Sequence, residues 1–328
     1  MSLAIIGLDE IRAAATPALV FAAVRESLIA HAEARTLVPP ATHLKFEAVG
    51  GDCHVKAGHV HGSRYATVKI ASGFPANEKL GLPSNNGVIL TFSAETGEPH
   101  SVLADEGWIT AWRTAAVGAL ATHTLAPPEI TEVGILGTGL QARLQIEWLD
   151  KLRPLGSVKV WGRRANAAQK LSADLCAAGI DARASDLEDV MQQDCIITAT
   201  ASTAPLAPSA AFQQVRHVTA LGADMPGKME LPSELFARAT EVVTDDHEQC
   251  LEYSDFGIAV REGFIPGTAD VPLGFVLRDG LGPSGRDPNA LTIADLTGVG
   301  ATDAAVANAV IDALDHVKVG GHGGARPL

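Results

Sequence analysis

Two lysines lie where a β-hairpin would bring them face to face. In HVKAGHVHGSRYATVKIASGF, residues 54–74, a two-residue turn at Gly62 and Ser63 places Lys56 directly opposite Lys69. Facing ammonium groups repel each other, so the pair is stable either in water or around a shared anion such as a carboxylate. The repulsion would lower the pKa of at least one lysine toward neutrality, which suits donation of a proton near pH 7. The hypothesis depends on register, because a shift of one residue separates the pair.

The alternative is that both lysines lie on a solvated face of the sheet. Their neighbours Val55, Ala57, Val68 and Ile70 are apolar and alternate with the lysines. We therefore expect the face opposite the lysines to be the buried one.

Arg113 and Asp224 are the other candidates for chemistry. Arg113 lies inside the apolar run WITAWRTAAVGALA, where a charge is costly unless it is paired, and its planar fork suits a substrate carboxylate. Asp224 closes GAD at the carboxyl end of an expected strand, the edge at which ligands bind in open α/β sheets. Asp224 is interpreted as a polar partner for substrate or lysine, or as a cap of its local turn.

A glycine-rich turn in GILGTGLQARLQ, residues 134–145, predicts a dinucleotide site. Gly137 and Gly139 fall where an expected strand becomes a helix, so backbone N–H groups at the helix start can receive a pyrophosphate. The acid that usually follows about twenty residues later and binds the NAD ribose is absent. Arg163 and Arg164 stand there instead and favour the 2′-phosphate of NADP(H), with NAD(H) possible; the alternative is two solvated surface arginines.

Composition excludes several classes of partner. The chain has 328 residues, 47% of them hydrophobic and 19% charged, which predicts a compact protein of two domains. A net charge of −13 disfavours nucleic acid and anionic membranes, and no run is long enough for a membrane span. Four cysteines without paired spacing indicate a reducing, cytoplasmic location. His54, His59 and His61 are clustered, but no full ligand set is identifiable, and we expect no metal.

The elements that must position these residues fall into two groups. Residues 8–34 have helical spacing, and residues 42–103 contain alternating runs broken by turns, which indicates an antiparallel sheet. Asp105 is a candidate cap for a helix over 108–126. Beyond it, EVGILG, VKVWG, CIITAT, HVTALGA and EVVTDD are short apolar runs separated mostly by helical segments, including PSELFARAT, which predicts a doubly wound parallel sheet. The helical segment ATDAAVANAVIDALDHV is expected to return to the first domain.

With these residues in hand, the chain resembles the ornithine cyclodeaminase and mu-crystallin family over nearly its whole length. The segments that carry the resemblance are ATVKIASGFPAN, GWITAWRTAAVGALA, VGILGTGLQARLQ, GADMPGKMEL and ADLTGVGATDAAVA. The resemblance implies a homodimer with a substrate-binding and dimerisation domain of α+β type, residues 1–116 with 301–328. It also implies a Rossmann-type dinucleotide-binding domain over 117–300, with the active site between the domains.

The resemblance further implies roles for individual residues. Lys69 matches the catalytic lysine, Asp224 the active-site aspartate and Arg113 the arginine that binds the substrate carboxylate. Several members carry Arg or Lys in the segment VPPATHLKF, where this chain has Ala41 or Thr42; Lys56 is the candidate substitute. The residues expected to bind cofactor are Gly137, Thr138, Gly139, Gln141, Ala142, Arg163, Arg164, Thr200, Lys228, Thr297 and Val299.

Three functions follow as hypotheses. The first is NAD(P)H-dependent reduction of an imine carboxylate, linear or cyclic, to an amino acid. The second is an ornithine cyclodeaminase, a lyase that returns the hydride and has no need of an NADPH preference. The third is a non-catalytic cofactor-binding or small-molecule-binding protein of the crystallin kind, which the presence of both Lys69 and Asp224 disfavours.

Overall fold

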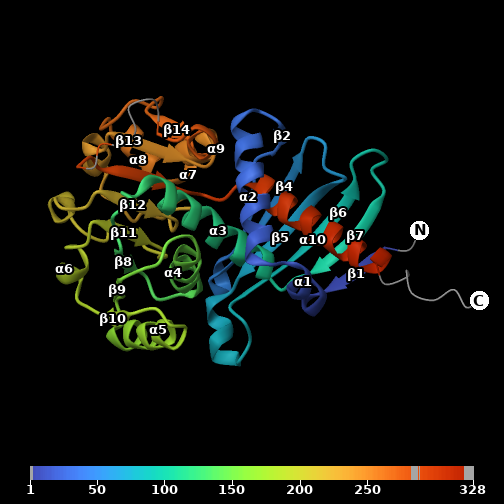
Figure 1. Ribbon diagram of the computed structural model, residues 1–328, viewed down its shortest axis with the longest axis horizontal. Helices are drawn as coiled ribbons and strands as arrows, with labels where there is room; N and C mark the ends of the chain where they lie inside the picture. Colours follow the sequence, from blue (N-terminus) through green and yellow to red (C-terminus); the bar gives the residue numbers. More distant parts are fainter. Residues whose placement is uncertain (1–2, 282–286, 288, 321–328) are drawn as a thin grey trace, which may run out of the picture. The chain divides into compact units, whose positions relative to one another are not determined.

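The computed structural model describes residues 3–281, 287 and 289–320, and the chain divides into two compact units. Unit 1 comprises Met1–Arg113 and Val299–Leu328, and unit 2 comprises Thr114–Gly298 (Figure 1). Unit 1 is α+β and unit 2 is a parallel α/β sheet with helices, which confirms the predicted fold class.

Unit 1 is built on one seven-stranded sheet. The strands from β3 to β7 pair antiparallel, as the turn-rich sequence predicts. Two strands were not predicted, namely β1, which pairs parallel with β7, and the two-residue β2, which pairs with β4. The order is β1-β7-β6-β5-β4-β2, with β3 also on β4. The bounds are β1 Ala4–Gly7, β2 Thr36–Leu37, β3 Thr42–Phe46, β4 Gly51–Val60, β5 Tyr65–Gly73, β6 Asn85–Ser93 and β7 Pro99–Ala104.

The N-terminal helical segment is two helices and not one. α1 covers Leu8–Ala14 and α2 covers Pro17–Ala32. Pro17 occupies the first position of α2, where a missing N–H costs nothing, and the Thr16 hydroxyl caps the helix by accepting from the Leu19 N–H at 3.2 Å. Among the described helices no single one is long and apolar enough to cross a membrane; α1 and α2 pass that test only jointly, across a bend of 83°.

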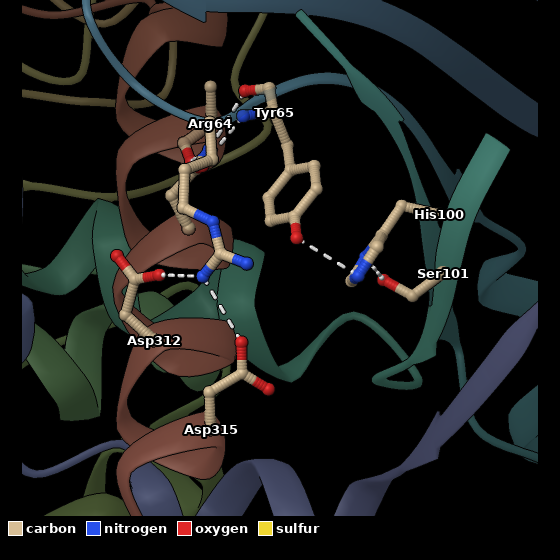
Figure 2. Close-up of polar contacts among 8 residues, drawn as sticks. Arg64, Tyr65, His100, Ser101, Asp312 and Asp315 are labelled. Carbon is tan, nitrogen blue, oxygen red and sulfur yellow. Dashed lines mark hydrogen bonds and ion pairs between the residues drawn. The ribbon is translucent and has the colours of Figure 1, made fainter. Parts of the chain in front are cut away.

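The long helix α10, Gly300–Gly320, packs on β4 and β5 as expected for the returning segment (Figure 1). Two glycines allow the close approach, because a Cβ on Gly58 would lie 2.4 Å from the Gly300 carbonyl oxygen. Arg64 fixes the far end of the helix, its guanidinium lying 2.9 Å from Asp312 and 3.1 Å from Asp315 (Figure 2). The Asn308 amide donates to the Tyr65 carbonyl and accepts from the Tyr65 N–H.

This packing corrects one expectation about the sheet. Helix α10 covers the face that carries Lys56 and Lys69, which are 8% and 2% exposed. The opposite apolar face, which we expected to be buried, is only partly covered, and Ile70 on it is 42% exposed. Within this chain the lysine face is therefore the covered one, because Asp303 of the helix, and not water, meets Lys69.

Unit 2 is an eight-stranded sheet in which every neighbouring pair is parallel. Its order is β10-β9-β8-β11-β12-β15-β13-β14, so the chain switches direction between β8 and β11. All five predicted strands are present. The bounds are β8 Glu132–Leu136, β9 Ser157–Trp161, β10 Ala182–Ala184, β11 Cys195–Thr198, β12 His217–Ala220, β13 Glu241–Thr244, β14 Asp270–Pro272 and β15 Thr292–Asp295.

The helical segments between these strands are largely as predicted, with one exception. The segment PSELFARAT forms a 3₁₀ helix, η4, Ser233–Arg238, and not an α-helix. The Asp105 carboxylate accepts from the Ile109 N–H at 2.9 Å and so caps α3, as predicted. The α-helices are α3 Trp108–Leu125, α4 Leu140–Leu152, α5 Ala165–Ala177, α6 Leu187–Val190, α7 His247–Tyr253, α8 Asp255–Arg261 and α9 Leu273–Asp279.

Candidate active site

The predicted lysine pair exists, and it is buried. Lys56 on β4 pairs directly with Lys69 on β5, so the predicted register is confirmed. The turn itself differs from the predicted Gly62–Ser63 turn, because the Ser63 N–H donates to the Val60 carbonyl at 2.9 Å and Gly62 is the third residue of the turn. Gly62 has a φ of +88°, which glycine adopts without strain. A buried pair of like charges is stable only with negative charge nearby.

Asp303 supplies that negative charge. It lies in the first turn of α10 and is 1% exposed, and its Oδ2 is 2.8 Å from the Lys69 ammonium nitrogen. The other oxygen, Oδ1, accepts a hydrogen bond from Arg113 Nε at 2.9 Å. One carboxylate therefore holds both Lys69 and Arg113 in place, one on each oxygen.

Arg113 is oriented by this contact. The residue is 4% exposed, and its pairing through Nε leaves the two terminal nitrogens of the guanidinium without an acidic partner among the described residues. Two parallel N–H donors in a plane are the group that binds a carboxylate in a bidentate manner. The prediction that a charge inside this helix must be paired is confirmed by Asp303.

Three cations lie close together in unit 1. Asp303 binds Lys69 and Arg113, and Lys56 pairs with Lys69 across the two strands; we call Lys56, Lys69 and Arg113 the cation cluster. Asp105 is also buried, and desolvation raises the pKa of its carboxyl group.

Burial makes Lys69 a proton donor suited to neutral pH. Desolvation is the main cause that lowers the pKa of Lys69, from 10.5 to about 7, and Arg113 and Lys56 lower it further. Asp303 opposes this shift. Burial alone would raise the pKa of Asp303, but Arg113 and Lys69 outweigh burial and hold that pKa below its ordinary value.

Asp303 was missed from sequence. The segment GATDAAVA was interpreted only as the start of a helix, where an acidic residue is common because it favours the helix dipole. The available signal was that this helix was expected to return to the domain holding the two lysines. An acid in its first turn was therefore a candidate partner for them.

The glycine turn in unit 2 has the shape required to receive a phosphate. Gly137 has a φ of +133°, and a Cβ there would lie 2.4 Å from the Ala199 carbonyl oxygen, so only glycine fits. Gly139 is the N-cap of α4 and offers no side-chain cap, and open space surrounds its Cβ position. Gly139 thus leaves the start of α4 without a side-chain cap, and the N-terminus of a helix attracts anions such as a dinucleotide pyrophosphate, whose binding here stays a prediction. Thr138, Gln141 and Ala142 belong to the same strand-to-helix turn.

The remaining predicted residues of unit 2 lie at the same carboxyl edge of the sheet. Arg163 and Arg164 follow β9, are exposed, and make no ion pair within the described chain. Asp224 pairs with Lys228 at 2.7 Å in the turn after β12. Thr200 follows β11 and donates to Glu230, whereas Thr297 follows β15 and donates to Asp245. Val299, which was also expected to bind cofactor, is buried and belongs to unit 1.

Comparison of the chain with protein-family models identifies its family. The model of the ornithine cyclodeaminase/mu-crystallin family matches residues 8–318. The chain belongs to this family. Within the ornithine cyclodeaminase/mu-crystallin family, an alanine dehydrogenase of Archaeoglobus fulgidus is 34% identical over 292 residues, 88% of each chain. An iminosuccinate reductase of Paracoccus denitrificans is 30% identical over 253 residues, 77% of this chain and 78% of the relative.

Several solved structures are similar to nearly the whole chain. An archaeal alanine dehydrogenase dimer with bound NAD has a TM-score of 0.88 and 30% identity, covering 97% of this chain and 98% of its own. The Delta(1)-pyrroline-2-carboxylate reductase of Thermococcus litoralis, in complex with NADH and L-proline, has a TM-score of 0.86 and 25% identity, covering 96% and 98%. The iminosuccinate reductase of Paracoccus denitrificans, in complex with NAD⁺, has a TM-score of 0.85 and 27% identity, covering 97% and 98%.

The departure near residue 42 lies at the start of β3, which pairs with β4. Thr42 pairs with Val55, so its side chain shares the face of Val55 and not that of Lys56. Continuing the register would place Ala41, and not Thr42, on the face of Lys56. Lys56 as the substitute cation stays a prediction.

Proposed function

We propose that this chain is an NAD(P)H-dependent reductase that converts an imine carboxylate, linear or cyclic, to an amino acid. The observation that carries the proposal is the cation cluster, in which the terminal nitrogens of Arg113 bind no acid among the described residues and lie beside a lysine of lowered pKa. Relatives named as reductases of iminosuccinate and of Delta(1)-pyrroline-2-carboxylate act on compounds of this class.

Unit 1 supplies the groups that act on the substrate. Arg113 holds the substrate carboxylate with two N–H donors, and Lys56 adds a second positive charge. Lys69 donates a proton to the imine nitrogen, which becomes the amine, and Asp303 keeps Lys69 directed toward it. The positive charges also favour the carboxylate form of the substrate.

Unit 2 supplies the groups that hold the cofactor. The turn at Gly137 and Gly139 would receive the pyrophosphate, and the Arg163–Arg164 pair would bind the 2′-phosphate of NADP(H) in preference to NAD(H). When bound, the reduced nicotinamide supplies a hydride to the C=N carbon. Asp224 is proposed to orient the catalytic lysine or, in the reverse or deaminating direction, to activate water.

A cyclodeaminase is the second candidate. A lysine cyclodeaminase structure with 25% identity and a TM-score of 0.84 covers 97% of this chain and 94% of its own. Such a lyase releases ammonia without net use of cofactor. The basic pair at Arg163 and Arg164 favours the reductase, because a cofactor that is never exchanged has no need of NADPH selectivity.

We also propose that the chain forms a homodimer through the uncovered face of the sheet in unit 1. Val55, Val68, Ile70, Val88 and Leu90 lie on this face, and none of them is fully buried. An archaeal relative is described as a dimer. Sedimentation equilibrium would measure the state directly, and a monomer at micromolar concentration would contradict the proposal.

A cytoplasmic location is part of the same proposal. Cys53, Cys176, Cys195 and Cys250 are all free thiols, which suits a reducing compartment. Fractionation of cells that express the tagged chain would test the location, and recovery outside the cytoplasm would contradict it.

A substrate panel tests the function. Purified protein would be mixed with NADPH or NADH and with cyclic imino acids, or with pyruvate or glyoxylate plus an amine. Loss of the reduced-nicotinamide absorbance with at least one member supports the reductase, and no loss with any member contradicts it. Proline and ammonia formed from ornithine without net cofactor turnover would establish the lyase instead.

A further inference from the structure

Glu230 is a fully buried carboxylate that joins two loops of unit 2. Its Oε1 accepts from the Thr200 backbone N–H at 2.6 Å and from the Thr200 hydroxyl at 2.7 Å. Its Oε2 accepts from the Gly222 backbone N–H at 2.7 Å and from the Thr198 hydroxyl at 2.6 Å. Each oxygen therefore holds one backbone N–H and one hydroxyl.

The two loops follow neighbouring strands at the carboxyl edge of the sheet. Thr200 lies after β11 and Gly222 after β12, and these strands pair in parallel. Ligands of open α/β sheets bind at this edge. Gly222 is two residues before Asp224, so Glu230 sets the position of both Thr200 and the start of the Asp224 turn.

The backbone of Glu230 is itself anchored by two hydrogen bonds. Its N–H donates to the Asp255 carboxylate at 3.0 Å, and its carbonyl accepts from the Leu206 N–H at 2.8 Å. The junction leaves no spare room, because a Cβ on Gly222 would lie 2.2 Å from the Thr200 carbonyl oxygen and about as close to the Glu230 carboxyl group. A small change in Glu230 must therefore move at least one of the loops.

We propose that Glu230 is a positioning residue of the cofactor edge, which holds the loops at Thr200 and Gly222 in the arrangement that hydride transfer requires. The inference rests on the proposed function and adds a residue that touches neither substrate nor cofactor. Its burial as an acid has a cost that an apolar contact would avoid. A carboxylate suits the place because it accepts on both oxygens, as two backbone donors require.

The variant Glu230→Gln follows from this geometry. The hydroxyls of Thr198 and Thr200 can rotate to accept a hydrogen bond, but the N–H groups of Thr200 and Gly222 cannot. Whichever way the amide is turned, its NH₂ faces one of the two backbone N–H groups. The variant keeps the size of the side chain and releases one loop.

The matched control is Asp270→Asn in the same unit. The Asp270 side chain is also buried, but it accepts from the side chains of Thr244 and His247 and is not bonded to the loops at Thr200 and Gly222. This control loses a buried carboxylate without changing the Glu230 junction. Both variants would be compared with the parent for melting temperature, NADPH dissociation constant, kcat, and the isotope effect with C4-deuterated NADPH.

The expected result is specific to a positioning role. Glu230→Gln should lower kcat by up to about a hundredfold and raise the primary isotope effect on kcat, because misplacement slows the hydride step itself. Asp270→Asn should change the melting temperature but not the isotope effect. An unchanged kcat and isotope effect in Glu230→Gln, or the same change in both variants, would overturn the proposal.

A gentler variant covers the case in which Glu230→Gln does not fold. Thr198→Val removes one donor from Oε2, keeps the shape of a buried residue and leaves both backbone N–H bonds in place. It should shift kcat and the isotope effect in the same direction by a smaller factor, and no shift would count against the proposal. Failure of the parent chain to reduce any imine would instead refute the proposed function, so the two failures are distinguishable.

Discussion

The ammonium of Lys69 lies 2.8 Å from the carboxylate of Asp303, although strand β5 and helix α10 come from opposite ends of the sequence. The C-terminal helix thus supplies the acid that makes a buried lysine tolerable. The same acid orients Arg113 through its other oxygen. Asp303 therefore links the proposed proton donor to the proposed carboxylate-binding group.

Replacing Asp303 should weaken both folding and catalysis. Asp303→Asn leaves Lys69 and Arg113 buried without their counter-charge, and the free energy of unfolding should fall by about 3 kcal/mol. The matched control is Asp312→Asn on the same helix, whose ion pair with Arg64 is exposed and should cost less than about 1 kcal/mol. Urea denaturation measures both, and equal losses would argue against a special role for Asp303.

The activity should depend on the protonation of Lys69. Because the pKa of Lys69 is lowered to about 7, the protonated donor dominates below pH 7, and kcat/KM for imine reduction should fall as pH rises through this value. Asp303 raises this pKa, so Asp303→Asn should move the falling limb to lower pH. Lys69→Arg remains charged and should lack the limb altogether. A limb that persists in Lys69→Arg would assign the titration to another group.

The same shift has a consequence for stability. Lys69 binds its proton less tightly in the folded chain than in the unfolded chain, whose pKa is the ordinary 10.5. Between about pH 7 and 10.5 the unfolded state therefore binds more protons at this residue. The contribution of Lys69 to the free energy of unfolding should thus increase with pH across that window, and it should be most unfavourable below pH 7.

Arg113 should act through its shape as well as its charge. Arg113→Ala should weaken transition-state binding by about 3 kcal/mol, and this loss would be measured as a fall in kcat/KM. Arg113→Lys keeps the charge but loses the two-donor fork, and it should recover only part of the activity. Steady-state kinetics with the best imine of the panel would show this order, whereas an unchanged kcat/KM in Arg113→Ala would remove the residue from the site.

Much of the fold and part of the site could be predicted from the sequence, because they depend on local pattern. The pairing of Lys56 with Lys69 was predicted from a hairpin turn placed at Gly62 and Ser63, and the register is as predicted although the turn bond joins Val60 and Ser63. Five of the eight strands of unit 2 were predicted as short apolar runs separated mostly by helical segments, whereas β10, β14 and β15 were not predicted. Gly137 and Gly139 were identified by their place between a strand and a helix.

The rest depends on contacts between distant segments. Nothing local in GATDAAVA shows that Asp303 meets a lysine and an arginine from two other elements. Strand β1 is only four residues long, too short to show a period, and its partner β7 is far away in sequence. The insertion of β15 between β12 and β13 is likewise set by tertiary packing. That the lysine face of the unit 1 sheet is covered was not foreseen, because α10 brings Asp303 to Lys69.

The basic pair after β9 should set the cofactor preference. Changing Arg163 and Arg164 together to Ala should weaken NADPH binding more than NADH binding, since only NADPH carries the 2′-phosphate. Fluorescence titration of both cofactors measures the ratio of dissociation constants. The double change of Lys151 and Lys170 to Ala, charges on exposed parts of α4 and α5, is a control for general loss of positive charge. An equal loss for both cofactors in the arginine variant would cancel the predicted preference.

The most direct test of the central claim follows the hydrogen that the cofactor delivers. Reduced cofactor carrying deuterium at C4, on the face that the enzyme uses, would be incubated with an imine carboxylate from the panel, and the amino acid would be analysed by mass spectrometry and NMR. The account predicts one deuterium per turnover at the carbon beside the carboxylate, and loss of this product in Arg113→Ala. Cofactor oxidation without label at that carbon, or no oxidation with any imine, would contradict it.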